Sequence, residues 1–142
     1  MYNRADKSVA VALLAAACSV LSVALWLKPA ASGYGTHTQL GLPPCAFLLV
    51  THLPCPSCGL TTCFAYAVRL QFWKAFLANP FGLFAFFGTV AAIPTAIYLL
   101  WRRISFRRIT EGPYFTKVVY AATAFYFASW IFRLTLMHFA SH

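Results

Sequence analysis

Long uncharged runs dominate the pattern of hydrophobic and polar positions along the chain. Residues 8–27 contain no charged side chain and are bounded by Lys7 and Lys28. At a rise of 1.5 Å per residue, a run of this length reaches about 30 Å, which is the thickness of the hydrocarbon core of a bilayer. Two further apolar runs, 80–101 and 118–137, predict a second and a third spanning helix.

The ends of two of these spans carry recognisable local signals. Asn is a favoured N-cap, and Pro suits the first helical position because its missing N–H would have no partner there. Asn79 and Pro80 therefore predict that the second spanning helix begins at Pro80, with the Asn79 side chain as its cap. Arg133 lies near the far end of the third span. We expect its long side chain to extend to the membrane surface.

The composition agrees with a membrane protein and excludes other classes. Of the 142 residues, 61% are hydrophobic and 9% are charged, whereas soluble domains carry about a quarter charged residues. The same figures exclude a disordered chain. The formal net charge is +9, but the basic residues flank the apolar runs and form no wettable basic face of the kind that binds nucleic acid. The expected partner is thus the lipid bilayer, and not nucleic acid.

The basic residues also predict an orientation. Cytoplasmic loops of membrane proteins carry an excess of Lys and Arg, and the loop between the second and third spans contains five: Arg102, Arg103, Arg107, Arg108 and Lys117. The N-terminus, with Arg4 and Lys7, is also expected in the cytoplasm. Three spans then place residues 29–79 and the C-terminus on the outer face of a bacterial inner (plasma) membrane. A four-span topology with the N-terminus outside is the alternative.

The segment 29–79 is unusual for an exterior loop. Its first 40 residues, 29–68, contain no Asp, Glu, Lys or Arg, yet prolines interrupt them at Pro43, Pro44, Pro54 and Pro56. Because proline breaks helices, these prolines disfavour a continuous span through the segment. We predict a re-entrant or interfacial hairpin, with residues 45–53 entering and a helix over 57–70 leaving, followed by an interfacial helix over 71–78. The fold class is one all-α integral membrane domain over 1–142, with three transmembrane helices and this Cys/Pro-rich hairpin.

Candidate chemistry is concentrated in the hairpin, which holds four of the five cysteines and lies near His37 and His52. In the Cys55-Pro-Ser-Cys58-Gly59 turn, two thiolates two residues apart could bind one zinc or other thiophilic metal ion, while the glycine lets the backbone turn. The predicted ligands are Cys45, Cys55 and Cys58, with Cys63 or His52 completing the set. Two alternatives stay open: a dithiol that exchanges with disulfides, and a static disulfide in an oxidising compartment.

Three sequence blocks carry a family resemblance. They are His37 to Cys45, Pro54 to Thr62 with its Cys-Pro-x-Cys-Gly-x-Thr pattern, and Ala78-Asn79-Pro80. Over residues 33–101 the chain resembles DUF2752, a family of small bacterial membrane proteins of unknown function. The resemblance implies an architecture and a site, but no reaction. The family pattern has Arg where this chain has Thr62 and does not include Cys63, which favours Cys45, Cys55 and Cys58 as the core of the site.

These features favour a metal-binding or structural accessory subunit of a membrane complex, associated with other membrane subunits or with itself. The competing class is a membrane thiol–disulfide oxidoreductase that uses Cys55 and Cys58 and needs an electron partner such as a quinone. Because paired carboxylates are lacking, glycosidase and aspartic-protease chemistry is excluded. His138 and His142 lie one helical turn apart, but a frayed terminus explains them more simply than a shared metal ion.

Overall fold

The structure is a computed structural model that describes residues 4–105 and 110–140, and all regular elements within these ranges are helices. Three of them are long and apolar enough to cross a membrane: α1 (Arg4–Trp26), α5 (Pro80–Arg102) and α7 (Pro113–Ala140). The predicted all-α membrane fold with three spans is therefore confirmed, and residues 4–105 and 110–140 contain no fourth helix of that length and hydropathy. Among the basic and histidine residues named above, Arg107, Arg108, His142 and the side chain of His138 lie outside the described residues.

The boundaries of α5 and α7 differ from the predicted ones for physical reasons. Helix α5 begins at Pro80, as predicted, and continues to Arg102. Helix α7 begins at Pro113, five residues before the predicted start at Val118. Proline is well suited to the first position of a helix. Hydropathy alone missed this first turn because it also contains the polar Thr116 and Lys117.

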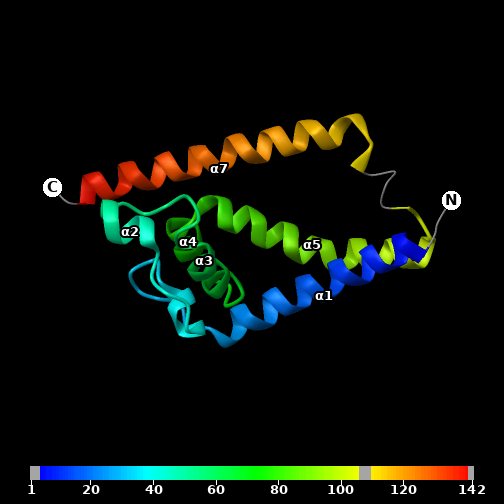
Figure 1. Ribbon diagram of the computed structural model, residues 1–142, viewed down its shortest axis with the longest axis horizontal. Coiled ribbons are helices and arrows are strands. Elements are labelled where there is room, and N and C mark those ends of the chain that lie inside the picture. The colour runs from blue at the N-terminus through cyan, green and yellow to red at the C-terminus, as the bar shows by residue number, and fades with distance from the viewer. Residues whose placement is uncertain (1–3, 106–109, 141–142) are drawn as a thin grey trace.

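Four short elements lie between α1 and α5: η1 (Thr36–Leu40), α2 (Ala46–Thr51), α3 (Leu60–Ala67) and α4 (Phe72–Ala78). They gather at the end of the molecule where α1 finishes and α5 begins (Figure 1). The chain between α2 and α3 is not helical over Pro54 and Pro56. The prolines thus interrupt the chain as expected. Helices α2 and α3 fall within the predicted arms 45–53 and 57–70 of the hairpin, and α4 falls within the helix predicted over 71–78.

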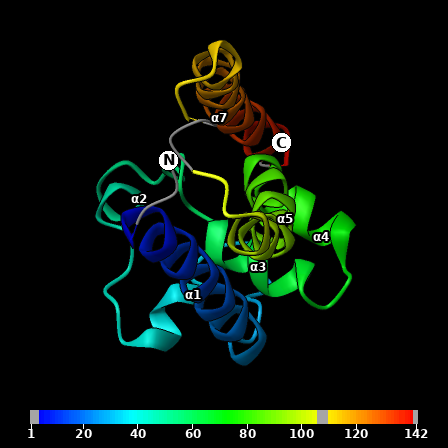
Figure 2. The ribbon, with the colours of Figure 1, turned by 90° about the vertical axis from the view of Figure 1, so that its right-hand side faces the viewer.

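The long helices are arranged around α5. Seen from the end, α5 lies between α1 and α7 (Figure 2), and it contacts both of them. The start of α1 and the end of α5 meet at the end of the molecule opposite the hairpin, where Ser105 Oγ donates a hydrogen bond of 2.6 Å to Asp6 Oδ1. Helices α1 and α5 therefore run antiparallel.

Small residues let the short helices approach α1 and α5 closely. The buried core contains four alanines and Cys63 together with Phe64 and Phe86, whose rings meet edge to face at 5.6 Å. A Cβ atom added at Gly82 of α5 would lie 3.0 Å from Cys63 Sγ on α3. Such close contacts between helices are typical of membrane proteins, where small residues bring backbones together.

Arg69 fixes the hairpin to the end of α1. Its guanidinium donates hydrogen bonds to Ala24 O at 3.2 Å and to Leu25 O at 2.7 Å, and a third to Ala65 O on α3 at 2.6 Å. The last carbonyls of a helix have no intrahelical partner and carry partial negative charge. Arg69 supplies both the donors and the positive charge that these carbonyls need, so it holds α3 beside the end of α1.

Candidate metal centre

Three cysteine side chains converge where the hairpin turns. Cys45 immediately precedes α2, and Cys55 and Cys58 lie in the turn between α2 and α3. Their Sγ atoms all lie within 4.8 Å of one another, in an arrangement that could hold a metal ion. The Sγ atoms of Cys55 and Cys58 are 3.1 Å apart. The cluster thus combines the Cys-x-x-Cys pair with a third thiol ten residues earlier in the chain.

The turn depends on a glycine that no other residue could replace without strain. The amide of Cys58 donates to Cys55 O at 3.0 Å and that of Leu60 to Ser57 O at 3.1 Å, which closes two successive turns. Gly59 then has a φ of +82°, and an added Cβ would lie 2.5 Å from Ala78 O and 2.7 Å from Gly33 O. Glycine is required here both for the left-handed backbone and for the close approach of two other chain segments.

Helix α7 binds the cysteine turn through three side chains. Trp130 Nε1 donates to Pro54 O at 2.8 Å, the hydroxyls of Tyr126 and Ser57 lie 2.9 Å apart, and Arg133 Nη1 donates to Cys58 O. Residues 126, 130 and 133 are spaced by four and three, so they occupy one face of the helix. Figure 1 shows the C-terminal half of α7 passing the loop that joins α2 to α3.

Asn79 connects the same turn to α5. Its Oδ1 accepts from Gly82 N at 2.9 Å, which confirms the predicted N-cap. Its Nδ2 donates to Pro56 O at 3.3 Å and to Cys58 O at 3.2 Å. Asn79 is only 1% exposed. One buried side chain therefore caps a spanning helix and binds two carbonyls of the cysteine turn.

The thiols of Cys45 and Cys58 differ in how readily they ionise. Burial raises the pKa of Cys58 to about 12, and the neighbouring Cys55 and Cys45 thiols add to the rise. The pKa of Cys45 is lowered, chiefly by a hydrogen bond with the backbone of Leu48. A hydrogen bond to the thiolate favours the charged form, whereas loss of water disfavours it. Cys45 is thus placed to ionise before Cys58.

Arg133 brings positive charge to this region. It is 6% exposed, and it does not extend to the end of α7 as the sequence suggested, because its guanidinium binds the Cys58 carbonyl. The chain contains only two acidic residues, Asp6 and Glu111, and Asp6 is bonded to Ser105 at the opposite end of the bundle. The ionisable groups that act electrostatically on Arg133 are Cys58, Cys55, Cys63 and Tyr34.

The cluster borders a cavity of about 290 Å³, and a histidine is also among the residues that line it. The three cysteines share its lining with His37, Ser57, Gly59, Leu60, Thr61 and Thr62. The other two predicted ligands, Cys63 and His52, do not belong to the cluster that is found among the described residues. Cys63 is fully buried on α3, and burial raises its pKa to about 12. His52 is exposed at the C-terminal end of α2.

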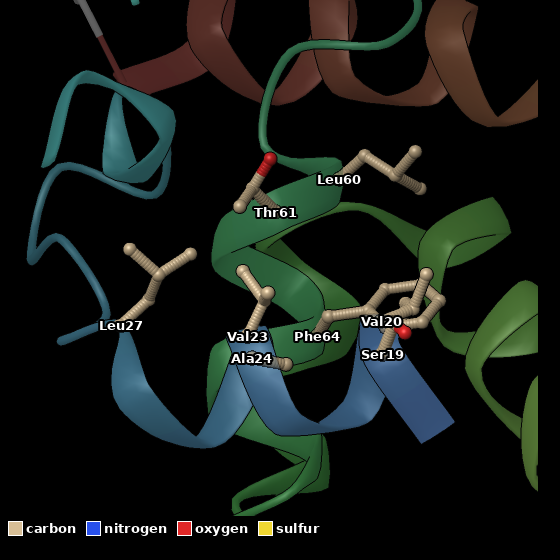
Figure 3. Close-up of a pocket in the computed structure, with 8 residues that line it drawn as sticks. All are labelled: Ser19, Val20, Val23, Ala24, Leu27, Leu60, Thr61 and Phe64. Carbon is tan, nitrogen blue, oxygen red and sulfur yellow. The ribbon is translucent and has the colours of Figure 1, made fainter. Parts of the chain in front are cut away.

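An apolar groove lies between α1 and α3, next to the cysteine cavity. It has a volume of about 310 Å³, and its lining side chains come from the last turns of α1 and from α3 (Figure 3). They are Ser19, Val20, Val23, Ala24, Leu27, Leu60, Thr61 and Phe64. Leu60 and Thr61 line both the groove and the cysteine cavity. The two hollows therefore share a wall.

Sequence reasoning missed the contribution of α7 to this site. No role was assigned to Tyr126 or Trp130 from the sequence alone, yet both side chains bond to the cysteine turn. The available signal was the spacing of Tyr126, Trp130 and Arg133, which places three hydrogen-bond donors on one helical face of a membrane span. Polar groups in such a span are costly unless they have partners, so a shared face points to a polar contact.

Comparisons with known proteins agree with the resemblance found in the sequence. Residues 45–100 match the family described as "Protein of unknown function (DUF2752)". This segment runs from Cys45 to near the end of α5 and contains all three clustered cysteines and Asn79. No curated protein and no solved structure matches the chain.

Proposed function

For a chain whose residues 45–100 carry the DUF2752 pattern, we propose a membrane protein that holds a thiophilic metal ion between Cys45, Cys55 and Cys58. Zinc fits this set, because thiolate ligands select zinc and other soft metals. The ion fixes the hairpin at one end of the helical bundle. The protein then serves as a metal-binding or structural accessory subunit of a membrane complex, associated with other subunits or with a second copy of itself.

The observation that carries this proposal is the convergence of three thiols, and not two. A structural disulfide would use Cys55 and Cys58 and leave the third sulfur, that of Cys45, without a role. A metal ion uses all three sulfurs, which already lie within 4.8 Å of one another. Two thiolates that bind one tetrahedral ion at about 2.3 Å lie about 3.8 Å apart. The Cys55 and Cys58 sulfurs, at 3.1 Å, would need to separate by only about 0.7 Å.

The charge of Arg133 gives independent support. A buried arginine in a membrane span is costly unless an opposite charge lies near it. A disulfide and a neutral thiol would offer none, whereas three thiolates around a divalent ion leave one net negative charge. Arg133 donates to the carbonyl of Cys58, so it is placed to balance that charge. The metal–thiolate cluster would therefore supply the counter-ion that this arginine lacks among the described residues.

The test is metal content measured on protein purified without chelators. We expect about one metal ion per chain, and loss of the ion in Cys45→Ser, Cys55→Ser and Cys58→Ser. Cys18→Ser is the matched control, because Cys18 is an exposed cysteine of α1 remote from the turn. Absence of metal from the parent protein after reconstitution with zinc, or equal metal content in all four variants, would overturn the proposal.

A second candidate function is favoured by the shared wall of the two hollows. A membrane thiol–disulfide oxidoreductase would oxidise the Cys55 and Cys58 thiols to a disulfide while a quinone accepts the two electrons and two protons and becomes a quinol. The apolar groove would accommodate the tail of such an acceptor next to the thiols, with Leu60 and Thr61 between them. Reduced protein should then convert a short-chain ubiquinone to its quinol with loss of two thiols per chain, and Cys55→Ser should abolish the reaction. Metal loading without quinone reduction would favour the first function.

The orientation of the protein is part of the proposal. Arg102 is the last residue of α5, and Arg103 follows it, at the end of the molecule where α1 begins. The excess of positive charge at that end supports a cytoplasmic location. The cysteine cluster would then lie toward the outer face of the plasma membrane of a bacterium.

A further inference from the structure

We infer that His37 is the fourth ligand of the metal ion, which would make the site a Cys3His centre. This inference rests on the proposed metal-binding function and deepens it. A tetrahedral structural site needs four ligands, and the cluster supplies three. His37 precedes the segment 45–100 that matches the family, so the fourth ligand would come from η1, outside that segment.

The first observation is the position of the histidine. His37 is the one histidine among the side chains that line the 290 Å³ cavity with Cys45, Cys55 and Cys58. Its side chain is half-buried, and no hydrogen bond of its ring occurs within the described part of the chain. An imidazole in a polar cavity without a partner is available to bind an ion. His52, which the sequence also offered as a ligand, is exposed at the end of α2 and does not line this cavity.

The second observation is that hydrogen bonds on both sides of His37 fix its backbone beside the cysteine turn. Thr36 is fully buried, and its Oγ1 lies 2.7 Å from the Oγ1 of Thr62, which itself lines the cavity. Thr36 Oγ1 also accepts from Ala30 N at 3.0 Å. On the other side, Gln39 forms two hydrogen bonds with the backbone of Lys28, at 3.1 and 2.6 Å. The ring of His37 lies outside the group of ligand atoms that are within 4.8 Å of one another, so its side chain must turn toward the three sulfurs when the ion binds. Because the backbone is already fixed, only this side-chain rotation has to be ordered, which lowers the entropic cost of binding.

The third argument is charge. A neutral imidazole completes the coordination shell and leaves the net charge of the centre at −1. This is the charge that Arg133 is placed to balance. Cys63, as a fourth thiolate, would add a second negative charge in a buried position. Its sulfur is also packed against the backbone of α5, since a Cβ added at Gly82 would lie 3.0 Å from it. The histidine therefore fits the site better than the remaining cysteine.

The test uses the full-length protein in detergent, loaded with zinc for X-ray absorption and with cobalt for optical titration. The parent protein should show three sulfur ligands at about 2.3 Å and one imidazole nitrogen at about 2.0–2.1 Å. His37→Ala should lose the imidazole scattering, keep the three sulfurs and bind cobalt at least about 10-fold more weakly, since loss of a mere supporting group already costs 10–100-fold. His52→Ala is the matched control and should leave both measurements unchanged.

A second variant separates loss of a ligand from local misfolding. His37→Cys replaces the imidazole by another zinc ligand, so it should restore cobalt binding relative to His37→Ala and show four sulfurs. Imidazole scattering that persists in His37→Ala, or that disappears in His52→Ala, would overturn the role of His37 while leaving the three-cysteine site intact. A parent protein that binds neither zinc nor cobalt would overturn the proposed function itself, and the role of His37 with it.

Discussion

Replacement of Asn79 by alanine should uncouple the cysteine turn from the spanning helices. The side chain makes four hydrogen bonds. One of 2.9 Å caps α5 through Gly82 N, two of 3.3 and 3.2 Å hold the carbonyls of Pro56 and Cys58, and Oδ1 accepts a longer one of 3.5 Å from Ser129 Oγ, which adds little to the total. Loss of an N-cap costs about 1 kcal/mol, and loss of each neutral hydrogen bond costs about 1 kcal/mol. The expected destabilisation of Asn79→Ala is therefore about 3 kcal/mol.

Asn79→Ser is the variant that separates the two roles. Serine is also a good N-cap, but it has no amide group that could reach the carbonyls of the turn. It should recover the capping contribution of about 1 kcal/mol and leave a deficit of about 2 kcal/mol. The turn should be loosened equally in both variants, because both lack the Nδ2 donor.

Two measurements check these values. The apparent melting temperature in detergent should fall in the order parent, Asn79→Ser, Asn79→Ala, by roughly 3 °C for each kcal/mol. In metal-free protein, the thiols of Cys55 and Cys58 should react faster with an alkylating reagent in both variants than in the parent. An unchanged melting temperature together with unchanged thiol reactivity in Asn79→Ala would refute the reasoning. A drop in melting temperature without faster alkylation would leave only the capping role.

Three further predictions concern other parts of the fold. Gly59→Ala should destabilise the protein by more than about 2 kcal/mol, because its Cβ would overlap Ala78 O in a backbone that already has a φ of +82°; thermal unfolding measures this, and a loss below about 0.5 kcal/mol, typical of surface substitutions, would contradict the close approach. Cys63 should resist alkylation in the folded protein at pH 8, since a pKa of about 12 leaves only about one thiol in ten thousand as the reactive thiolate; mass spectrometry locates the adducts, and rapid labelling of Cys63 would show that it is not buried. In intact cells, an impermeant maleimide should label Ser32→Cys above the level of the parent chain but should not label Arg102→Cys, and labelling of both or neither would contradict the proposed orientation.

The hydrophobic pattern located the spanning helices, because membrane spans depend on length and composition that any window of about 20 residues reveals. Helices α1 and α5 end within a few residues of the predicted limits. The prolines of the hairpin and the Asn79 cap were equally visible, since helix breaking and capping involve neighbouring residues only. The start of α7 was placed five residues too late because Thr116 and Lys117 hide the first helical turn in a hydropathy pattern.

The site required the tertiary structure. The Cys55-x-x-Cys58 pair could be recognised locally, and Cys45 was predicted as its companion, but the sequence left the fourth ligand open between Cys63 and His52. The fold brought the Cys45 sulfur within 4.8 Å of the other two, and it buried Cys63 in the contact between α3 and α5. It also placed His37 in the cavity through the contact of Thr36 with Thr62, 26 residues away.

The role of α7 shows the limit of the sequence most clearly. Arg133 near the end of an apolar run has a simple local explanation, extension to the membrane surface, and only the packing of α7 over the turn reveals its bond to Cys58, 75 residues away. The sequence by itself determined which segments are helical and membrane-spanning, since those properties follow from residues within a few turns of one another. Which thiols, donors and charges share one site was decided by the packing of helices that are distant in the chain, because contact between them depends on the path of the whole backbone.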